Sequence, residues 1–245
     1  MRIKIFALAA LVAASGVYAA AQSADEILSR LDAGSSFETI RYKGRMEITI
    51  GGKTRTKTME AMAEGAEKAF IEFTNPEDRG IRYLKLGKDL WMYFPKEDET
   101  MKISGHLLKE GMMGSDMSYE DALESQDYEQ RYSASRMGEE SLDGRRCFIV
   151  QLDAKVKDAP YDRRVMWIDA ERWVSLKEEM YAKSGKLLKV SRSLEVGRFG
   201  QRWYPIKVEM ESKLRKDTRT VISMEDLALD PKLPAGAFTM GALTK

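Results

Sequence analysis

Alternation of apolar and polar residues runs along most of the chain. In RMEITI, which begins at Arg45, every second residue is apolar, as in a strand with one buried face. The pair Gly51-Gly52 follows and predicts a tight hairpin turn. Regular spacing of such stretches predicts about eleven strands in an antiparallel sheet or barrel. The strand-like stretches are RMEITI, KTRTKTMEAMAEG, AFIEF, IRYLKL, DLWMYFP, TMKIS, YEQRYSASRMGEES, RRCFIVQLDAK, RRVMWID, WVSLKEEMY, KLLKVSRSLEVGRF, WYPIKVEME and RTVISMEDLAL.

Two regions have helical rather than alternating patterns. SADEILSRLD begins with Ser23 and has Glu26 three residues later, which is a capping box for a short amphipathic helix. Residues 104–126 also interrupt the strands, with helical pieces around Leu107 and from Ser118, where Asp121 completes a weaker capping box.

Several strands are apolar on both faces, most clearly DLWMYFP and RRVMWID. A sheet with one face in water would not show this pattern. Either protein covers both faces, or one face lines an apolar cavity. The helical content is low, so we expect a mainly β fold with an incomplete, strongly curved barrel that leaves a lumen.

Composition sets broad limits on the function. The 245 residues are 43% hydrophobic and 32% charged, and the net charge is +1. We therefore expect one globular domain over residues 22–245 with an apolar core. Lys and Arg form no basic tract, so no nucleic-acid partner is expected.

The first residues indicate export. Arg2 and Lys4 precede an apolar run from Ile5 to Val17, and small residues follow. We expect a signal peptide over residues 1–21, cleaved near Ala21, because the run is shorter than a membrane-spanning helix; an uncleaved anchor is the alternative. No cysteine lies near the cleavage site for lipid attachment, so a soluble periplasmic protein is predicted.

Candidate catalytic groups are few. Cys147 and His106 are the only cysteine and histidine, and no nucleophile elbow, phosphate-binding loop or zinc-protease motif occurs. We expect no metal site, no cofactor and no enzyme activity. The alternative is a lipid hydrolase that uses His106 as its base.

Methionine is unusually frequent, with fifteen residues in the chain. Met112, Met113 and Met117 cluster in GMMGSDMSYEDAL, and Gly111 and Gly114 flank the first two. Irregular core filling would explain a single methionine, but the cluster favours a mobile apolar flap.

Several segments resemble a known family. DLWMYFPKEDETMKIS followed by MMGSDMSYEDAL is similar to the LolA-like family of outer-membrane lipoprotein-sorting proteins. The resemblance extends over about Ala24 to Phe238, and further matches are MWIDAERWVSLKEEMYAKSGKLLK, WYPIKVEME and TVISMEDLALDPKLPAGAFT.

The resemblance implies an unclosed, curved sheet of about eleven strands, with helices plugging its concave side and a cavity for lipoprotein acyl chains. It implies a periplasmic lipoprotein carrier, or chaperone, that transports its cargo toward the outer membrane. Acylated lipoproteins or other lipids are the expected partners, together with an inner-membrane transporter and an outer-membrane acceptor. An accessory subunit docked on a membrane transporter is a second hypothesis.

Strands around Leu84 to Ile103 are expected to form much of the cavity wall, with the methionine cluster near its mouth. The candidate ligand-binding residues are Leu84, Leu86, Leu90, Trp91, Met92, Tyr93, Phe94, Met101, Ile103, Met112, Met113, Met117, Met166 and Trp167.

Overall fold

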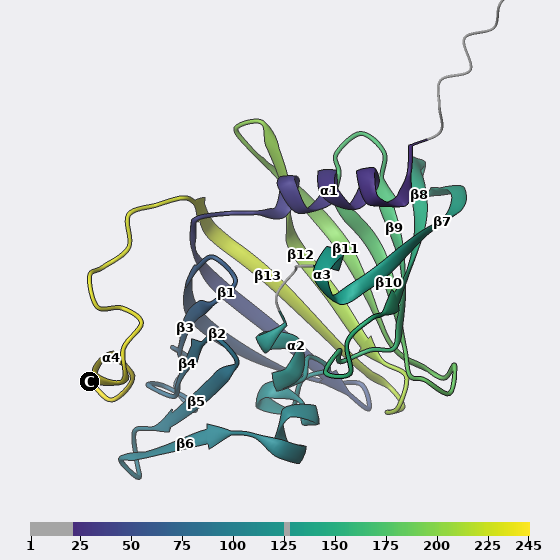
Figure 1. Ribbon diagram of the computed structural model, residues 1–245. Helices are drawn as coiled ribbons and strands as arrows, with labels where there is room; N and C mark the ends of the chain where they lie inside the picture. The colour runs from purple at the N-terminus through teal and green to yellow at the C-terminus, as the bar shows by residue number, and fades with distance from the viewer. Residues whose placement is uncertain (1–21, 125–127) are drawn as a thin grey trace, which may run out of the picture.

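The computed structural model describes residues 22–124 and 128–245 (Figure 1). The predicted signal peptide and its cleavage site at Ala21 lie outside the described residues. None of the described helices is long and apolar enough to span a bilayer.

The predicted mainly β fold is confirmed. Thirteen strands form one antiparallel sheet in the order β6-β5-β4-β3-β2-β1-β13-β12-β11-β10-β9-β8-β7. The sequence pattern predicts about eleven strands, and the sheet has thirteen because each alternating stretch forms a strand of its own. The strands are β1 (Thr39–Ile50), β2 (Lys53–Glu64), β3 (Lys68–Phe73), β4 (Arg82–Leu86), β5 (Asp89–Phe94), β6 (Glu99–Ile103), β7 (Tyr132–Leu142), β8 (Arg145–Ala154), β9 (Arg163–Asp169), β10 (Ser175–Tyr181), β11 (Leu187–Phe199), β12 (Arg202–Ser212) and β13 (Thr218–Leu229).

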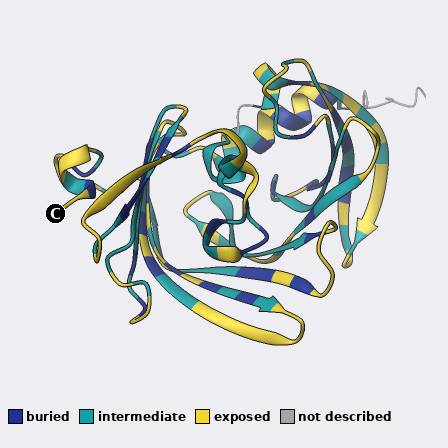
Figure 2. Ribbon diagram, turned by 90° about the horizontal axis from the view of Figure 1, so that it is seen from below, coloured by how far each residue is buried: buried dark blue, intermediate teal, exposed yellow. Residues whose placement is uncertain are grey.

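The sheet curves strongly but does not close. The first and last strands, β1 and β13, pair at its middle, so its two edges are the consecutive strands β6 and β7. The chain between these edges holds the short helices η1 (Gly105–Lys109), η2 (Met112–Gly114), α2 (Tyr119–Leu123) and α3 (Tyr128–Arg131). Figure 2 shows the sheet wrapped around these pieces. We call residues 104–124 the plug.

Helix α1 (Ala24–Ser35) lies over one end of the concave face. Its predicted capping box between Ser23 and Glu26 is confirmed. Ile27, Leu28 and Leu31 are buried in a cluster with residues of β7, β8 and β9. The helix thus covers the half of the sheet that the plug's apolar residues do not.

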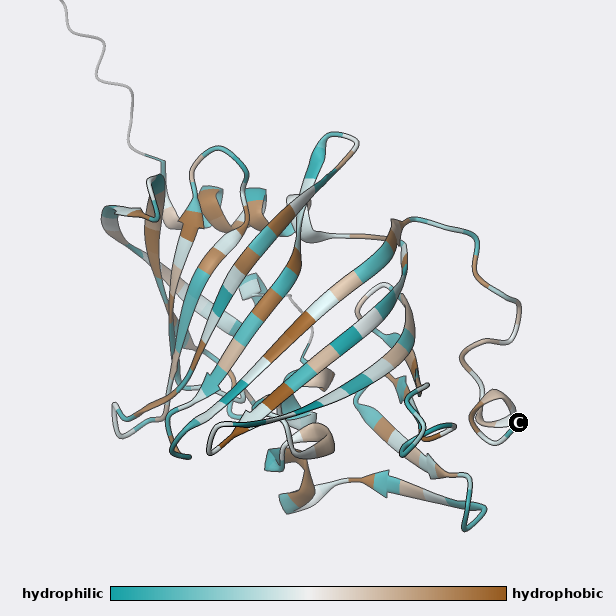
Figure 3. Cartoon of the chain, turned by 180° about the vertical axis from the view of Figure 1, so that it is seen from behind, coloured by the Kyte–Doolittle hydropathy of each residue, from teal (hydrophilic) through white to brown (hydrophobic). Residues whose placement is uncertain are grey.

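The C-terminal segment covers the outer face of β3, β4 and β5. Leu243 of helix α4 (Met240–Leu243) is fully buried against Phe70 and Leu84, and Arg82 donates hydrogen bonds to the carbonyl oxygens of Leu243 and Lys245. This explains the apolar pattern on both faces of β5, because the plug covers one face and this segment the other. Figure 3 shows the alternation of hydropathy along the central strands.

A buried carboxylate fixes the turn between β9 and β10. Asp169 accepts hydrogen bonds from the Arg145 guanidinium at 2.5 Å and from the backbone N–H groups of Glu171 and Arg172. The turn holds Trp173 at a φ of 55°. The indole ring of Trp173 stacks on the Phe148 ring, with 5.7 Å between the ring centroids, in the cluster under α1. Burial alone would raise the pKa of Asp169, but these hydrogen bonds together hold it below its usual value.

Asp169→Asn is expected to lower the free energy of unfolding by about 3 kcal/mol at pH 7, because Arg145 loses its buried partner. A carboxylate with a lowered folded-state pKa stabilises above its unfolded pKa of about 4, and this stabilisation disappears as the pH falls through the folded-state pKa. Denaturant unfolding should therefore be measured from pH 7 to pH 3. The free energies of unfolding of Asp169→Asn and of the wild type should approach each other below about pH 4. Asp143→Asn, on an exposed hairpin turn, is the control. A difference independent of pH would contradict this account.

Candidate functional site

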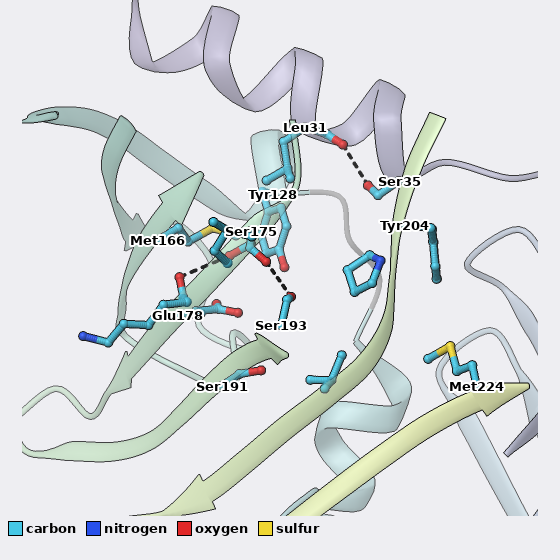
Figure 4. Close-up of a pocket in the computed structure, with 14 residues that line it drawn as sticks. Leu31, Ser35, Tyr128, Met166, Ser175, Glu178, Ser191, Ser193, Tyr204 and Met224 are labelled. Atoms are coloured by element: carbon cyan, nitrogen blue, oxygen red, sulfur yellow. Dashed lines mark hydrogen bonds between the residues drawn. The ribbon is translucent and has the colours of Figure 1, made fainter. Parts of the chain in front are cut away.

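The space between α1 and the concave face contains two adjoining cavities. The smaller one has a volume of about 210 Å³ (Figure 4). Leu31 of α1, Met166 of β9, Val208 of β12 and Met224 of β13 give it a largely apolar wall. Serines on β10 and β11 also line it, and Ser193 donates a hydrogen bond to the Ser175 carbonyl oxygen at 2.6 Å. This serine hydroxyl is therefore satisfied within the wall.

The larger cavity, of about 430 Å³, lies beside the first. Both cavities are lined by Ser35 and Tyr204, so they meet under the C-terminal end of α1. Part of the wall of the larger cavity consists of small residues, which leave the space open: Ala63, Gly65, Ala66, Ala69 and Ala122. The two spaces together fall within the size range of small-molecule sites, about 300–1,000 Å³.

A buried ion cluster stands between the plug and β9. Arg164, which is 2% exposed, donates hydrogen bonds to Glu178 at 2.5 Å, to Glu124 at the end of α2, and to the Tyr132 hydroxyl. Burial raises the pKa of Glu124, although Arg164 opposes the shift. Burial alone would lower the pKa of Arg164, but Glu178 and its other anionic neighbours raise it well above its usual value. The guanidinium therefore stays charged and holds the end of α2 against the sheet.

Lys85 is the buried cation of the larger cavity. It lies on β4, it is 6% exposed, and its ammonium donates to the Leu123 carbonyl oxygen at 2.9 Å. No carboxylate of the described residues lies within ion-pair distance of it. Burial lowers its pKa, and the charges of Glu67 and Glu124 act in the opposite direction. The hydrogen bond to Leu123 also ties the end of α2 to β4.

The plug is fastened to the middle of the sheet by Asp116. This carboxylate is buried and accepts hydrogen bonds from the hydroxyls of Thr218 and Thr220 at 2.8 and 2.9 Å, and from Arg215 at 2.7 Å. The Asp116 N–H also donates to Thr220. Four hydrogen bonds thus join one residue of the plug to β13 and the turn before it.

A second carboxylate of the plug combines a helix cap with a tether. The predicted capping box between Ser118 and Asp121 is confirmed. Asp121 also accepts hydrogen bonds from Lys189 of β11 at 2.5 Å and from the Tyr161 hydroxyl. The polar residues of the GSDMSYED stretch therefore fix the position of the plug in the sheet.

The predicted site residues divide into three groups. One group packs together where the plug fills the concave face of β5 and β6, and none of its predicted members lines either cavity. Tyr83 and Phe73 belong to the same cluster. Met101 lies opposite Met92 across β5 and β6 and is exposed. Met101 is outside the cluster, and the predicted residues within it are Leu90, Met92, Phe94, Ile103, Met112, Met113 and Met117.

The second group lies on the outer face, where Leu84, Leu86, Trp91 and Tyr93 pack with the C-terminal segment. The third comes from β9. Met166 lines the smaller cavity, whereas the indole N–H of Trp167 donates to Glu140 and the Lys177 ammonium lies 3.9 Å from its ring centroid. Met166 is the one predicted residue that lines either described cavity. Ligand contact by the whole set stays a prediction.

The methionine segment forms a tight turn. Met112 is buried, and Met113 has a φ of 53°. A Cβ on Gly111 would lie 2.1 Å from the Ser115 carbonyl oxygen, so glycine is required there. The predicted motion of this segment remains a prediction, but the anchors at Asp116 and Asp121 restrict where it can hinge.

The two residues considered for catalysis lie apart from the cavities. His106 is exposed on η1. Cys147 is buried on β8, and burial raises the pKa of its thiol to about 11, which disfavours the reactive thiolate. Neither residue lines the two cavities.

Sequence reasoning missed the residues that define the cavities and tethers. Lys85 had a readable signal, because it is a charged residue inside RYLKL, between two apolar neighbours of a buried strand. Asp116 and Asp121 lie in the most distinctive motif, but their partners on β11 and β13 are about seventy and one hundred residues away. No local pattern predicts such pairs.

Comparison with known proteins agrees with this architecture. The model of a family described as "-like: Uncharacterized protein" matches residues 65–245, well over half of the chain. The chain belongs to this family.

Several solved structures have the same fold as this chain. A DUF1329 family protein from Desulfovibrio piger is 26% identical, with a TM-score of 0.82 over 89% of this chain and 96% of that one. A protein domain assigned to outer membrane lipoprotein sorting, from Vibrio parahaemolyticus, is 21% identical, with a TM-score of 0.80 over 90% and 97%. LolA superfamily protein NE2245 from Nitrosomonas europaea is 21% identical, with a TM-score of 0.74 over 91% and 100%. The resemblance read from the sequence is confirmed, and the fold is LolA-like.

A curated relative is longer. Uncharacterized protein MJ0687 from Methanocaldococcus jannaschii is 26% identical over 161 residues, which cover 64% of this chain. The match spans 44% of that protein, so this chain corresponds to less than half of its length.

Asp116→Ala is expected to free the plug. Removing the carboxylate leaves Thr218, Thr220 and Arg215 without their buried acceptor, which should lower the free energy of unfolding by about 3 kcal/mol. Hydrogen exchange followed by mass spectrometry should show faster exchange in residues 105–123 and little change in α1. Glu120→Ala, in the same segment, is the control. Unchanged protection of the plug in Asp116→Ala would show that the anchor is elsewhere.

Proposed function

We propose that this protein is a periplasmic carrier that binds the acyl chains of lipoproteins or other lipids and ferries them toward the outer membrane. The observation that carries the proposal is the pair of adjoining cavities between α1 and the concave face. The LolA-like fold supports it, since two of the solved relatives are named for lipoprotein sorting or for the LolA superfamily.

The physical task matches the cavity walls. An acyl chain needs shelter from water, and burying each CH₂ group is worth about 0.8 kcal/mol. Leu31, Met166, Val208 and Met224 offer apolar contacts for such a chain. Methionine side chains adapt to ligands of varied shape. The cargo is transferred unchanged, so the carrier has no need of a catalytic group.

Delivery requires that the ligand can leave. The cavities lie between α1 and the sheet, which are separate elements. Three residues of α1 are buried against the sheet: Ile27, Leu28 and Leu31. A small displacement of α1 would open the space around Tyr204, which lines both cavities. Tyr204 is half-buried, and its ring packs edge-on against Phe37 with 6.4 Å between the ring centroids. An inner-membrane transporter that loads the carrier and an outer-membrane acceptor that unloads it are the proposed partners.

Val208→Trp is expected to weaken binding of an acyl ligand by about tenfold or more, because the indole occupies space that two or more CH₂ groups would fill. Displacement of the neutral dye N-phenyl-1-naphthylamine by methyl dodecanoate measures the affinity. Leu194→Trp is the matched control, because it also replaces an aliphatic side chain with tryptophan but does so at an exposed position of β11. Equal affinities for both variants and wild type would place the ligand elsewhere.

Native mass spectrometry of the protein after export to a periplasm tests the proposal as a whole. Gentle purification should recover a fraction of the chain with the added mass of an acylated lipid or lipoprotein, and Val208→Trp should reduce that fraction. Recovery of the bare chain alone, together with no displacement of the dye by acyl compounds, would reject the carrier function.

A further inference from the structure

Lys85 stands out among the buried groups of the molecule. An ammonium has three hydrogen-bond donors, and the structure gives the Lys85 ammonium one acceptor, the Leu123 carbonyl oxygen. The side chain lines the larger cavity and is 94% buried, since 6% of the residue is exposed. Burial of a cation with unused donors is costly unless something else satisfies them. A ligand in this cavity is placed to supply the missing acceptor.

The surrounding charges indicate what kind of acceptor fits. Arg164 faces the two carboxylates of Glu124 and Glu178, so this group of three carries one excess negative charge. Lys85 feels the fields of Glu67 and Glu124, and its ammonium supplies a compensating positive charge. Arg164, Lys85 and the two glutamates that contact Arg164 are together neutral. The side chains that line the cavity also carry two charges of each sign: Lys68, Lys85, Asp32 and Glu124. A ligand that added a carboxylate would bring an unbalanced negative charge close to Glu124, whereas a carbonyl oxygen would accept a hydrogen bond without changing the balance.

The space beside Lys85 indicates what the rest of the ligand is. The larger cavity adjoins the smaller one at Ser35 and Tyr204, which line both, and the wall of the smaller cavity includes Met166 and Val208. A carbonyl held by Lys85 would therefore lie beside a second space with a largely apolar wall, which Lys177 and Glu178 border on one side. This is the arrangement of an acyl chain attached through its carbonyl to a neutral ester or amide.

We propose that Lys85 recognises the carbonyl oxygen of an esterified or amidated acyl chain, and that the site selects such neutral acyl groups over free fatty acids. This inference rests on the proposed carrier function and adds the chemistry of the ligand's polar end. Lys85 acts here as a binding residue, and the small residues around it, such as Ala63 and Ala122, leave room for the linked group.

Three ligands of the same chain length test the inference: methyl dodecanoate, dodecyl methyl ether and dodecanoic acid. Each displaces N-phenyl-1-naphthylamine from the wild-type chain at pH 8. The ester is expected to bind about tenfold more tightly than the ether, because the ether lacks the carbonyl oxygen that would accept a hydrogen bond from the Lys85 ammonium. One hydrogen bond to a charged group is worth about that ratio in affinity. The acid, ionised at this pH, is expected to bind no more tightly than the ester.

Lys85→Met should reduce the ratio of ester to ether affinity to about one, because methionine keeps the apolar bulk and removes the donors. Lys43→Met, which removes an exposed lysine paired with Asp226 on the outside of the sheet, should leave the ratio unchanged. Wild-type affinity of Lys85→Met for the dye itself shows that the cavity is intact.

The outcomes separate the two proposals. Equal binding of ester and ether to the wild type, or a ratio that survives in Lys85→Met, overturns the role of Lys85 and leaves the carrier function standing. Tighter binding of the acid than of the ester, lost in Lys85→Met, overturns the preference for neutral groups and identifies an anion site. Failure of all three compounds to displace the dye rejects both the inference and the carrier function.

Discussion

The two edges of the sheet are joined in sequence but do not pair, and the rest of the structure depends on this constraint. Because β1 and β13 meet at the middle, β6 and β7 lie at opposite edges, and the plug, residues 104–124, packs into the hollow of the sheet. A segment that lies on an apolar concave face must pair the polar groups that it buries, because an unpaired buried polar group is costly. Asp116, Asp121 and Glu124 do this by ion pairs and hydrogen bonds to distant strands.

These tethers divide the concave side into a filled half and an open half. The plug packs its methionines and leucines against β4, β5 and β6, while α1 spans the other half from above. The cavities remain where the two coverings approach each other, beside Tyr204. Arg164 and Lys85 both hold the end of α2. Lys85 has a second role, because it also borders the larger cavity.

Local rules predicted much of the fold. Period-two alternation located the strands, and the capping boxes at Ser23 and Ser118 located two helix starts. The pairing of β1 with β13 could not be read from the sequence, since it joins residues about 180 positions apart. Strands apolar on both faces gave an ambiguous signal, and the C-terminal segment resolved it by covering the outer face of β5. The cavity wall was therefore expected around β4 to β6, whereas the described cavities lie mostly under α1.

Photo-crosslinking with a dodecanoyl ester that carries a diazirine near the end of its chain would locate the bound acyl chain. Peptide mass spectrometry should find the label on the walls of the smaller cavity, at residues such as Met166, Val208 and Met224. Excess unlabelled ester should abolish that labelling. Label on the outer face, at Leu84 or Trp91, or labelling that does not saturate, would contradict the claim that acyl chains enter the space between α1 and the sheet.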